Sequence, residues 1–423
     1  MTFFSRLTDN ATLKALGPGL ITGAADDDPS GIATYSQAGA QFGFNTLWTL
    51  VLTYPFMVGI QLVSARIGRV TGRGLAANIR RAYSPWLLYA IVILLLVANV
   101  INIAADIAAM GEAMHLVTRF GSPHLYSLGF GLLCLSLQIV LPYTSYVRYL
   151  KWLTLALLAY VATVFMVNMP WTEVLKRTAW PHFAFTKDSV GLVVAIFGTT
   201  ISPYLFFWQA SQEVEEIRAD DSTRALRSKP MDARRQLRRI KTDTFIGMGF
   251  SNLVAYFIML TTAVTLGAHG ITSIQTSAQA AEALRPLAGE FAFILFALGI
   301  IGTGMLAVPV LAGSAAYAVT ESFRWRNGLD LKAVEAQEFY GIIALATIGG
   351  MLLNFAPIDP IKALVLSAQI NGVIAVPIMT VMMMLVHNRK IMGDYRLTRR
   401  HTIIGWFGVA IMLVAVVAMF MTM

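Results

Sequence analysis

The sequence has 423 residues, of which 57% are hydrophobic and only 13% are charged, whereas a soluble domain is about 25% charged. This composition excludes an ordinary soluble fold and predicts an all-α polytopic membrane protein. The single cysteine, Cys134, excludes an internal disulfide, and the net charge of +9 is more typical of basic loops that orient a membrane protein than of a nucleic-acid partner.

Eleven stretches are long and apolar enough to cross a bilayer, which takes about 20 helical residues. Lys and Arg gather in every second connection, after spans 2, 4, 6, 8 and 10. Because cytoplasmic loops are rich in these residues, we predict an integral protein of a bacterial-type inner (plasma) membrane, with its N-terminus cytoplasmic and its C-terminus outside. The predicted spans are 15–38, 45–67, 85–115, 122–142, 150–169, 189–213, 242–267, 288–322, 338–355, 361–387 and 402–422.

The first span is interrupted by three carboxylates, a proline and a glycine within Asp26-Asp27-Asp28-Pro29-Ser30-Gly31. Charges at membrane depth are costly and usually functional, and proline breaks a helix. Freed backbone groups are tolerated in a bilayer only where protein or a water-filled cavity covers them. We therefore predict a cation site here, with Asp28 as the ligand. Asp26 and Asp27 are expected to line the aqueous approach or carry a proton; the alternative is a polar cap at a span end.

The third span places Asn99, Asn102 and Asp106 on one helix face, because residues three and four apart are neighbours on a helix. An aspartate inside the membrane indicates a cation or proton relay. A hydrogen bond between helices is the alternative interpretation of Asp106.

The sixth span has a second break at Ser202-Pro203, shortly after Thr199. An offset of five spans means that the two broken segments enter from opposite sides, and such pairs point to a transporter binding site. Oxygen atoms of Thr199 and Ser202 are candidate ligands, with hydrogen bonds inside the helix as the alternative. For Tyr204 and Gln209, which follow the break, packing and a place on a proton or approach path both stay open.

The paired breaks predict an internal repeat within a single transmembrane transporter domain over 1–423. Spans 1–5 would form the first repeat (1–169), spans 6–10 the second (189–387), and span 11 an addition (402–422). The stretch 214–241 is highly charged and is expected to be a basic cytoplasmic loop, for which a partly helical structure stays open. Three glutamates at the cytoplasmic end of span 6 are expected to be solvated: Glu213, Glu215 and Glu216.

In the tenth span, Gln369 and Asn371 lie two residues apart and therefore on different helix faces, so only one of them is expected to complete the site. The candidate ligands are carboxylate, hydroxyl, amide and carbonyl oxygens. Such hard donors select Mg²⁺, Ca²⁺ and Mn²⁺. We expect the transported substrate to be a divalent metal ion and the protein to lie in the lipid bilayer. We expect no resident cofactor and no nucleic-acid partner. The sequence carries no signal for an oligomeric state.

Three stretches resemble the Nramp family of divalent-metal transporters. They are Gly17-Pro18-Gly19-Leu20 with Asp28-Pro29-Ser30-Gly31 and Gly39-Ala40-Gln41-Phe42-Gly43, then 65–73, and then 391–396. The resemblance covers essentially the whole chain. It implies a LeuT-like fold of 5+5 inverted repeats plus an eleventh transmembrane helix, with helices 1 and 6 broken, and it implies that Asp28 is the acidic ligand.

The sequence departs from the family at the ligands. The family's Asp-Pro-Gly-Asn is Asp-Pro-Ser-Gly here, so Gly31 replaces an amide ligand. The family's Met-Pro-His is Ser-Pro-Tyr here, so Ser202 replaces a thioether and Tyr204 a histidine. Gln209 stands in place of a second histidine. The third helix keeps the family's aspartate, Asp106, but not the glutamate three residues later.

These departures resemble the Nramp-related magnesium transporter branch, which carries Mg²⁺ and Mn²⁺ with little proton coupling. A small residue at Gly31 is expected to leave room for the ligand waters that Mg²⁺ sheds reluctantly. We therefore predict a secondary transporter of Mg²⁺ or Mn²⁺, weakly or not coupled to protons. A proton-coupled Mn²⁺/Fe²⁺ symporter and an organic-substrate symporter of the same fold are the alternatives. The Gly-x-Gly-Asp motif of an intramembrane aspartyl hydrolase is absent from the sequence, and we expect no enzymatic activity.

Overall fold

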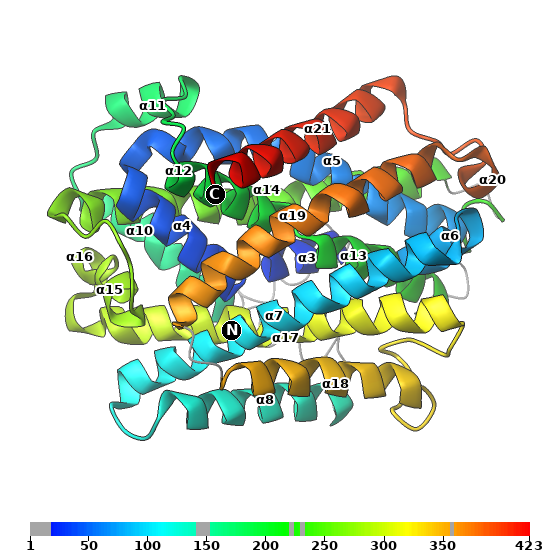
Figure 1. Cartoon of the computed structure of the whole chain (residues 1–423), viewed down its shortest axis with the longest axis horizontal. Coiled ribbons are helices and arrows are strands. Elements are labelled where there is room, and N and C mark those ends of the chain that lie inside the picture. The colour runs from blue at the N-terminus through cyan, green and yellow to red at the C-terminus, as the bar shows by residue number, and fades with distance from the viewer. Residues whose placement is uncertain (1–17, 141–152, 220–223, 229–232, 356–358) are drawn as a thin grey trace, which may run out of the picture.

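The computed structural model describes residues 18–140, 153–219, 224–228, 233–355 and 359–423, and within these ranges all regular secondary structure is helical (Figure 1). The elements, with η for 3₁₀-helices, are α3 (Pro18–Asp26), α4 (Pro29–Phe42), η1 (Gly43–Thr46), α5 (Leu47–Thr71), α6 (Leu75–Ala82), α7 (Pro85–Thr118), α8 (Pro123–Val140), η2 (Leu153–Leu157), α10 (Leu158–Met166), α11 (Trp171–Ala179), α12 (Lys187–Thr200), α13 (Pro203–Ala219), α14 (Ala233–Thr265), η4 (Gly267–His269), α15 (Ser277–Glu282), α16 (Arg285–Ala288), η5 (Gly289–Phe291), α17 (Ala292–Phe323), α18 (Gln337–Leu353), α19 (Pro360–His387), α20 (Arg389–Met392) and α21 (Arg399–Thr422).

Each of the predicted spans coincides with helix over most of its described length. By length and apolarity, eight helical stretches of the described chain qualify as membrane-crossing, or nine if Leu155–Met166 and Trp171–Ala179, bent by 120°, form one span. The count is lower than predicted for two reasons. The stretch Pro29–Thr71 holds both α4 and α5 and counts once, and α18 has only 17 residues.

Both predicted helix breaks are present. The first separates α3 from α4 at Asp27 and Asp28, and the second separates α12 from α13 at Ile201 and Ser202. In each case a proline begins the second half-helix, where its missing N–H and fixed φ are tolerated. The predicted interruption of helices 1 and 6 is therefore confirmed.

The broken helices pack against neighbouring helices so closely that their backbones are in contact. A Cβ atom on Gly23 of α3 would lie 2.3 Å from the carbonyl oxygen of Gly247 in α14, and one on Gly198 of α12 would lie 2.0 Å from that of Ala368 in α19. Neither position therefore accepts a side chain without displacing a helix. This close packing positions the two breaks in the interior of the protein.

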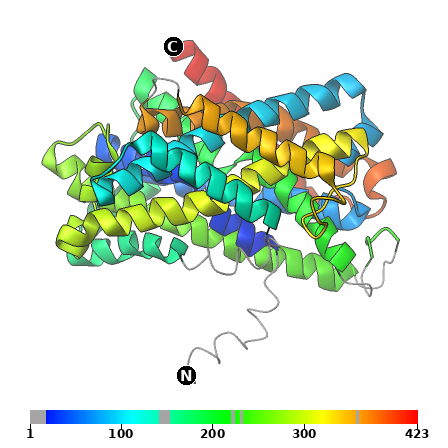
Figure 2. The ribbon, with the colours of Figure 1, turned by 90° about the horizontal axis from the view of Figure 1, so that it is seen from below.

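The remaining long helices form layers around the breaks. In Figure 1, α7 and α17 run side by side, α8 and α18 lie beyond them, and α21 lies on the opposite side next to α19 and α5. Figure 2 views the protein from the side of α8 and α18, which lie nearest the viewer. These outer helices expose apolar side chains such as Leu132, Leu345 and Val414, as expected where lipid acyl chains form the solvent.

The stretch 214–241, predicted as a basic cytoplasmic loop, is helical over part of its described length. Helix α13 continues to Ala219 and α14 already begins at Ala233, while 220–223 and 229–232 lie outside the described residues. The segment between them is attached to α5, because the Leu226 N–H donates to the Arg69 carbonyl oxygen at 3.2 Å. Many of the charged residues described here therefore lie on extensions of the membrane helices α13 and α14.

The glutamates at the end of α13 are not solvated as predicted. Glu213 is fully buried, Glu215 is 8% exposed, and only Glu216 is partly exposed. The extension of α14 carries Arg239 against them, with Nη2 at 2.8 Å from Glu213 Oε2 and 2.8 Å from Glu216 Oε2. Glu215 instead accepts a hydrogen bond from the Tyr317 hydroxyl at 2.8 Å. Buried carboxylates are tolerated here because each has a partner.

Candidate functional site

The first break fixes the direction of Asp28. This residue is the N-cap of α4, with φ −71° and ψ 170°, and its Oδ1 accepts hydrogen bonds from the Gly31 N–H and the Ser30 hydroxyl, both at 2.7 Å. An aspartate N-cap satisfies an N–H that has no partner within the helix. Asp28 is 2% exposed. The residues that break the helix therefore also hold a buried carboxylate in one orientation.

Asn102 of α7 joins three polar side chains around this carboxylate. Its Nδ2 donates to Asp28 Oδ2 at 3.1 Å and to Asp106 Oδ2 at 3.0 Å, and its Oδ1 accepts from Asn371 Nδ2 of α19 at 3.0 Å. All four residues are at most 2% exposed. The sequence signal for Asn102 is its spacing of four from Asp106; we did not predict it as a site residue.

The structure separates the two candidates on the tenth span. Asn371 belongs to the Asn102 network, whereas Gln369 donates to the Gly191 carbonyl oxygen of α12 at 3.1 Å. Gly191 lies more than two helical turns before Thr199 in α12. Asn371, and not Gln369, therefore faces the Asp28 site.

At the second break, the Ser202 side chain forms hydrogen bonds to the end of the preceding helix, α12. Its hydroxyl donates to the carbonyl oxygens of Thr199 at 2.8 Å and Gly198 at 3.0 Å, which are among the last carbonyls of α12. The Thr199 hydroxyl instead faces the first break, because a Cβ atom on Gly31 would lie 3.0 Å from Thr199 Oγ1. Thr199 and Asp28 thus approach each other across the two breaks.

The room expected beside Gly31 is filled. The same Cβ atom would lie 3.3 Å from Cε2 of Tyr35 and 3.5 Å from Asp28 Oδ1. Tyr35 stands one turn after Gly31 on α4, so its ring reaches back along the helix surface. Glycine at this position therefore accommodates Tyr35 and Thr199 rather than open space. Tyr35 was not predicted as a site residue, because an aromatic residue in a membrane span is most often a packing residue.

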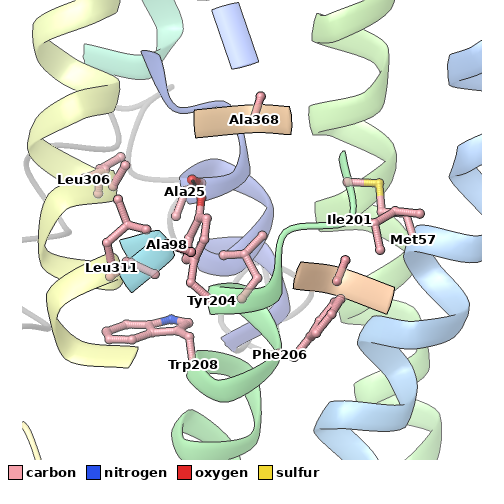
Figure 3. Packing of buried hydrophobic residues seen from close by; sticks show 14 of the residues in the cluster. Ala25, Met57, Ala98, Ile201, Tyr204, Phe206, Trp208, Leu306, Leu311 and Ala368 are labelled. Carbon is pink, nitrogen blue, oxygen red and sulfur yellow. Dashed lines mark hydrogen bonds between the residues drawn. The ribbon is translucent and has the colours of Figure 1, made fainter. Parts of the chain in front are cut away.

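Tyr204 and Gln209 connect the two breaks. The Tyr204 hydroxyl donates to the Ala25 carbonyl oxygen at 3.0 Å, and the Thr22 hydroxyl donates to Gln209 Oε1 at 2.5 Å. Both bonds join α13 to α3. Figure 3 shows Tyr204 directed toward Ala25, with Trp208 packed further along α13. These contacts are interhelical hydrogen bonds; a place for either residue on a proton path stays a prediction.

Asp26 and Asp27 face away from Asp28. Both accept a hydrogen bond from the Ser251 hydroxyl of α14, at 2.8 Å to Asp26 Oδ2 and 3.0 Å to Asp27 Oδ1. Their exposed fractions are 1% and 2%. The three consecutive aspartates thus divide between two neighbouring helices, α14 and α7.

The groups around Asp28 keep unused oxygen atoms. Asp106 Oδ1, Asn371 Oδ1 and Thr199 Oγ1 are buried and have no hydrogen-bond partner among the described residues. Such atoms cost about 1–3 kcal/mol each, which coordination of a cation would offset. Within the described ranges, no group of three or more His, Cys, Asp or Glu side chains is arranged to hold a metal. A cation at Asp28 therefore needs amide, hydroxyl, carbonyl or water oxygens as well.

A family model described as "Natural resistance-associated macrophage protein-like" (Nramp) matches residues 19–422. The chain belongs to the Nramp family. The Nramp match runs from the second residue of α3 to the last residue of α21. It therefore includes both broken helices and the two helices, α7 and α19, that surround Asp28.

Relatives of this Nramp chain are named as transporters. The divalent metal cation transporter MntH of Mycobacterium leprae is 27% identical over 416 residues, which is 96% of this chain and 92% of that protein. MntH of Pectobacterium carotovorum is 25% identical over 396 residues, 92% and 89% of the two chains.

Solved structures share the fold. A manganese transporter of Eremococcus coleocola matches with a TM-score of 0.75 at 18% identity, over 96% of this chain and 87% of that one. Mhp1, a nucleobase-cation-symport-1 family transporter, matches in a closed conformation with a TM-score of 0.60 at 13% identity, over 96% and 92%. The LeuT-like fold that the family resemblance implied, and with which the paired breaks agree, is thereby confirmed.

Proposed function

We propose that this protein is a secondary transporter that carries a hard divalent cation, Mg²⁺ or Mn²⁺, across the cytoplasmic membrane by alternating access. The observation that carries this proposal is the buried Asp28 carboxylate at the first break, joined through Asn102 to Asp106 and Asn371 and faced by Thr199 of the second break. The relatives named as divalent metal and manganese transporters support the substrate class.

Asp28, Thr199 and Asn371 are the proposed side-chain ligands, with Gly31 and Ser202 lining the site. All the donors are hard oxygens, and neither sulfur nor imidazole is among them, which favours Mg²⁺ and Mn²⁺ over softer metals. Asp106 is the one further carboxylate in the Asn102 network, so proton coupling is proposed to be weak or absent. The repeats would be α3–α10 and α12–α19, with α21 as the addition and the N-terminus cytoplasmic.

Uptake of metal into proteoliposomes that contain Asp28→Ala tests this proposal. We expect uptake of Mg²⁺ and Mn²⁺ to fall to the level of protein-free liposomes, because the variant lacks the anionic ligand. Glu290→Gln is the matched control, since the Glu290 side chain is 88% exposed and far from the breaks in sequence. Uptake by Asp28→Ala close to that of the control would refute the assignment.

The same liposomes decide between the proposal and a proton-coupled Mn²⁺/Fe²⁺ symporter. A pH probe inside the vesicles is read while Mg²⁺, Mn²⁺, Ca²⁺ and Fe²⁺ are added in turn. We expect Mg²⁺ or Mn²⁺ to enter without acidification of the interior. Acidification in step with Mn²⁺ or Fe²⁺ uptake, and no Mg²⁺ uptake, would favour the symporter.

A further inference from the structure

The ring of Tyr35 takes up the space that the missing side chain of Gly31 leaves beside Asp28. A Cβ atom at Gly31 would lie 3.3 Å from Cε2 of the Tyr35 ring. The same point lies 3.0 Å from Thr199 Oγ1 and 3.5 Å from Asp28 Oδ1. An aromatic ring edge and side-chain oxygens of two proposed ligands therefore surround one point between the two breaks.

The hydroxyl of Tyr35 extends from the first break toward the second. The Tyr35 side chain is fully buried, and its hydroxyl interacts with the Thr199 hydroxyl of α12. Apart from this contact, neither hydroxyl has a hydrogen-bond partner among the described residues. The two groups carry two hydrogens, of which their mutual contact uses one. A buried tyrosine hydroxyl usually has its hydrogen bonds satisfied, so this pair is suited to a ligand that enters between the breaks.

A rigid ring at this place limits the room around an ion bound at Asp28. Ca²⁺ takes about six to eight oxygen ligands at about 2.3–2.6 Å, whereas Mg²⁺ takes about six at about 2.0–2.1 Å. The larger ligand shell of Ca²⁺ needs more room on the Gly31 side of the site. The Tyr35 ring occupies that side, and its complete burial leaves it no free surface toward which to turn away.

We propose that Tyr35 is a specificity-determining residue, whose ring limits the ligand shell of the transported ion and thereby selects Mg²⁺ or Mn²⁺ over Ca²⁺. The oxygen donors of the site do not make this choice, because Ca²⁺ also prefers hard oxygen ligands. The inference rests on the proposed function, since it concerns the ion bound at Asp28. It assigns the choice between hard ions to the shape of the site rather than to its ligand atoms.

The ratio of Ca²⁺ uptake to Mn²⁺ uptake in proteoliposomes tests the role of the ring. Mn²⁺ is the reference ion, because the proposed transporter and its proton-coupled alternative would both carry it. Smaller side chains in Tyr35→Leu and Tyr35→Ala should raise the ratio, by about tenfold in the alanine variant. Tyr35→Phe removes only the hydroxyl and keeps the ring, so it should keep the ratio of the wild type.

Tyr160→Ala is the matched control for the loss of a buried tyrosine. Tyr160 of α10 is 2% exposed, and its side chain lines a small cavity with Leu157 and Phe296 instead of contacting Asp28. This variant creates a similar cavity and is expected to lose stability in the same way. Its ratio of Ca²⁺ uptake to Mn²⁺ uptake should nevertheless stay that of the wild type.

The outcomes separate this inference from the proposed function. Mn²⁺ uptake that depends on Asp28, with the wild-type ratio in Tyr35→Leu and Tyr35→Ala, would overturn the role of Tyr35 and leave the transporter assignment intact. Equal uptake of Ca²⁺ and Mn²⁺ by the wild type would overturn it as well. So would a change of the ratio in Tyr35→Phe or Tyr160→Ala as large as in Tyr35→Ala. Absence of any divalent uptake that depends on Asp28 would refute the proposed function, and this inference with it.

Discussion

Asn102→Leu is the sharpest perturbation of the proposed metal site. Leucine has the branching of asparagine but no polar atoms, so the change removes hydrogen bonds with little change of shape. Two of the lost bonds go to carboxylates, at about 1.5–3 kcal/mol each, and the third, from Asn371, is a neutral bond of about 1 kcal/mol. The loss is then about 4–7 kcal/mol before the gain from burying leucine.

Asn99→Leu is the matched control on the same helix. Asn99 is also fully buried and also donates twice, to the Leu311 carbonyl oxygen at 2.8 Å and to the Ser314 hydroxyl at 2.7 Å. Both bonds are neutral, so the loss is about 2 kcal/mol. The gain from the new leucine is similar in both variants and cancels. The free energies of unfolding should therefore differ by about 2–5 kcal/mol.

Metal affinity gives the second measurement. Groups that orient a metal ligand typically change metal affinity 10–100-fold when they are removed. We expect the concentration of Mn²⁺ at half-maximal uptake to rise by that factor in Asn102→Leu and to stay unchanged in Asn99→Leu. Equal effects of the two variants, on denaturation in mixed micelles and on uptake, would refute the idea that Asn102 positions Asp28.

Two further substitutions test other parts of the structure. Arg239→Ala leaves the fully buried Glu213 without its cationic partner and should lower the free energy of unfolding by about 3–5 kcal/mol. The double variant Arg239→Met/Glu213→Gln should recover most of this loss. If it does not recover the stability, the result would argue against the ion pair. Ser202→Met places a thioether at the second break and should raise Fe²⁺ uptake relative to Mg²⁺ uptake about tenfold. Ser202→Ala, which only loses bonds to carbonyls of its own helix, should leave that ratio unchanged, and an equal change in both would contradict the selectivity argument.

The two breaks and Asp28 were predictable because their signals are local. A proline beside a carboxylate inside an apolar run conflicts with a continuous membrane helix wherever it occurs. The pairing of two such breaks five spans apart then predicted the internal repeat, and the resemblance to the Nramp family implied the fold. The polar face of α7 could also be predicted from the sequence, since Asn102 and Asp106 are four residues apart.

The contacts between distant helices were not predictable in the same way. The choice between Gln369 and Asn371 depends on the rotation of α19 about its axis, which close packing of Ala368 on Gly198 sets. Tyr35 was not identified from the sequence because an aromatic residue in a membrane span is most often a packing residue. The interpretation of Gly31 as open space failed because a missing side chain leaves room only if no neighbour fills it.

The stretch 214–241 shows a different limit of sequence analysis. Hydropathy marks where a helix leaves the bilayer, but helix α14 begins at Ala233, well before its apolar part. Arg239 lies on this extension and reaches Glu213, so charges that suggest a solvated loop form a buried ion pair. Charge density alone does not distinguish the two arrangements.

The division of the three aspartates follows from the two residues of unwound backbone, Asp27 and Asp28, between α3 and α4. Asp26 ends α3 in helical register, so its side chain points to α14, whereas Asp28 adopts an extended conformation and turns toward α7. Adjacent charges thus reach opposite neighbours, Ser251 and Asn102. Any motion that displaces α14 relative to α7 must change the distance between Asp28 and the Ser251 pair or break one set of bonds. Under the proposed alternating-access mechanism, such groups of helices move against each other, and a movement of α14 would then act on the ion site at the breaks.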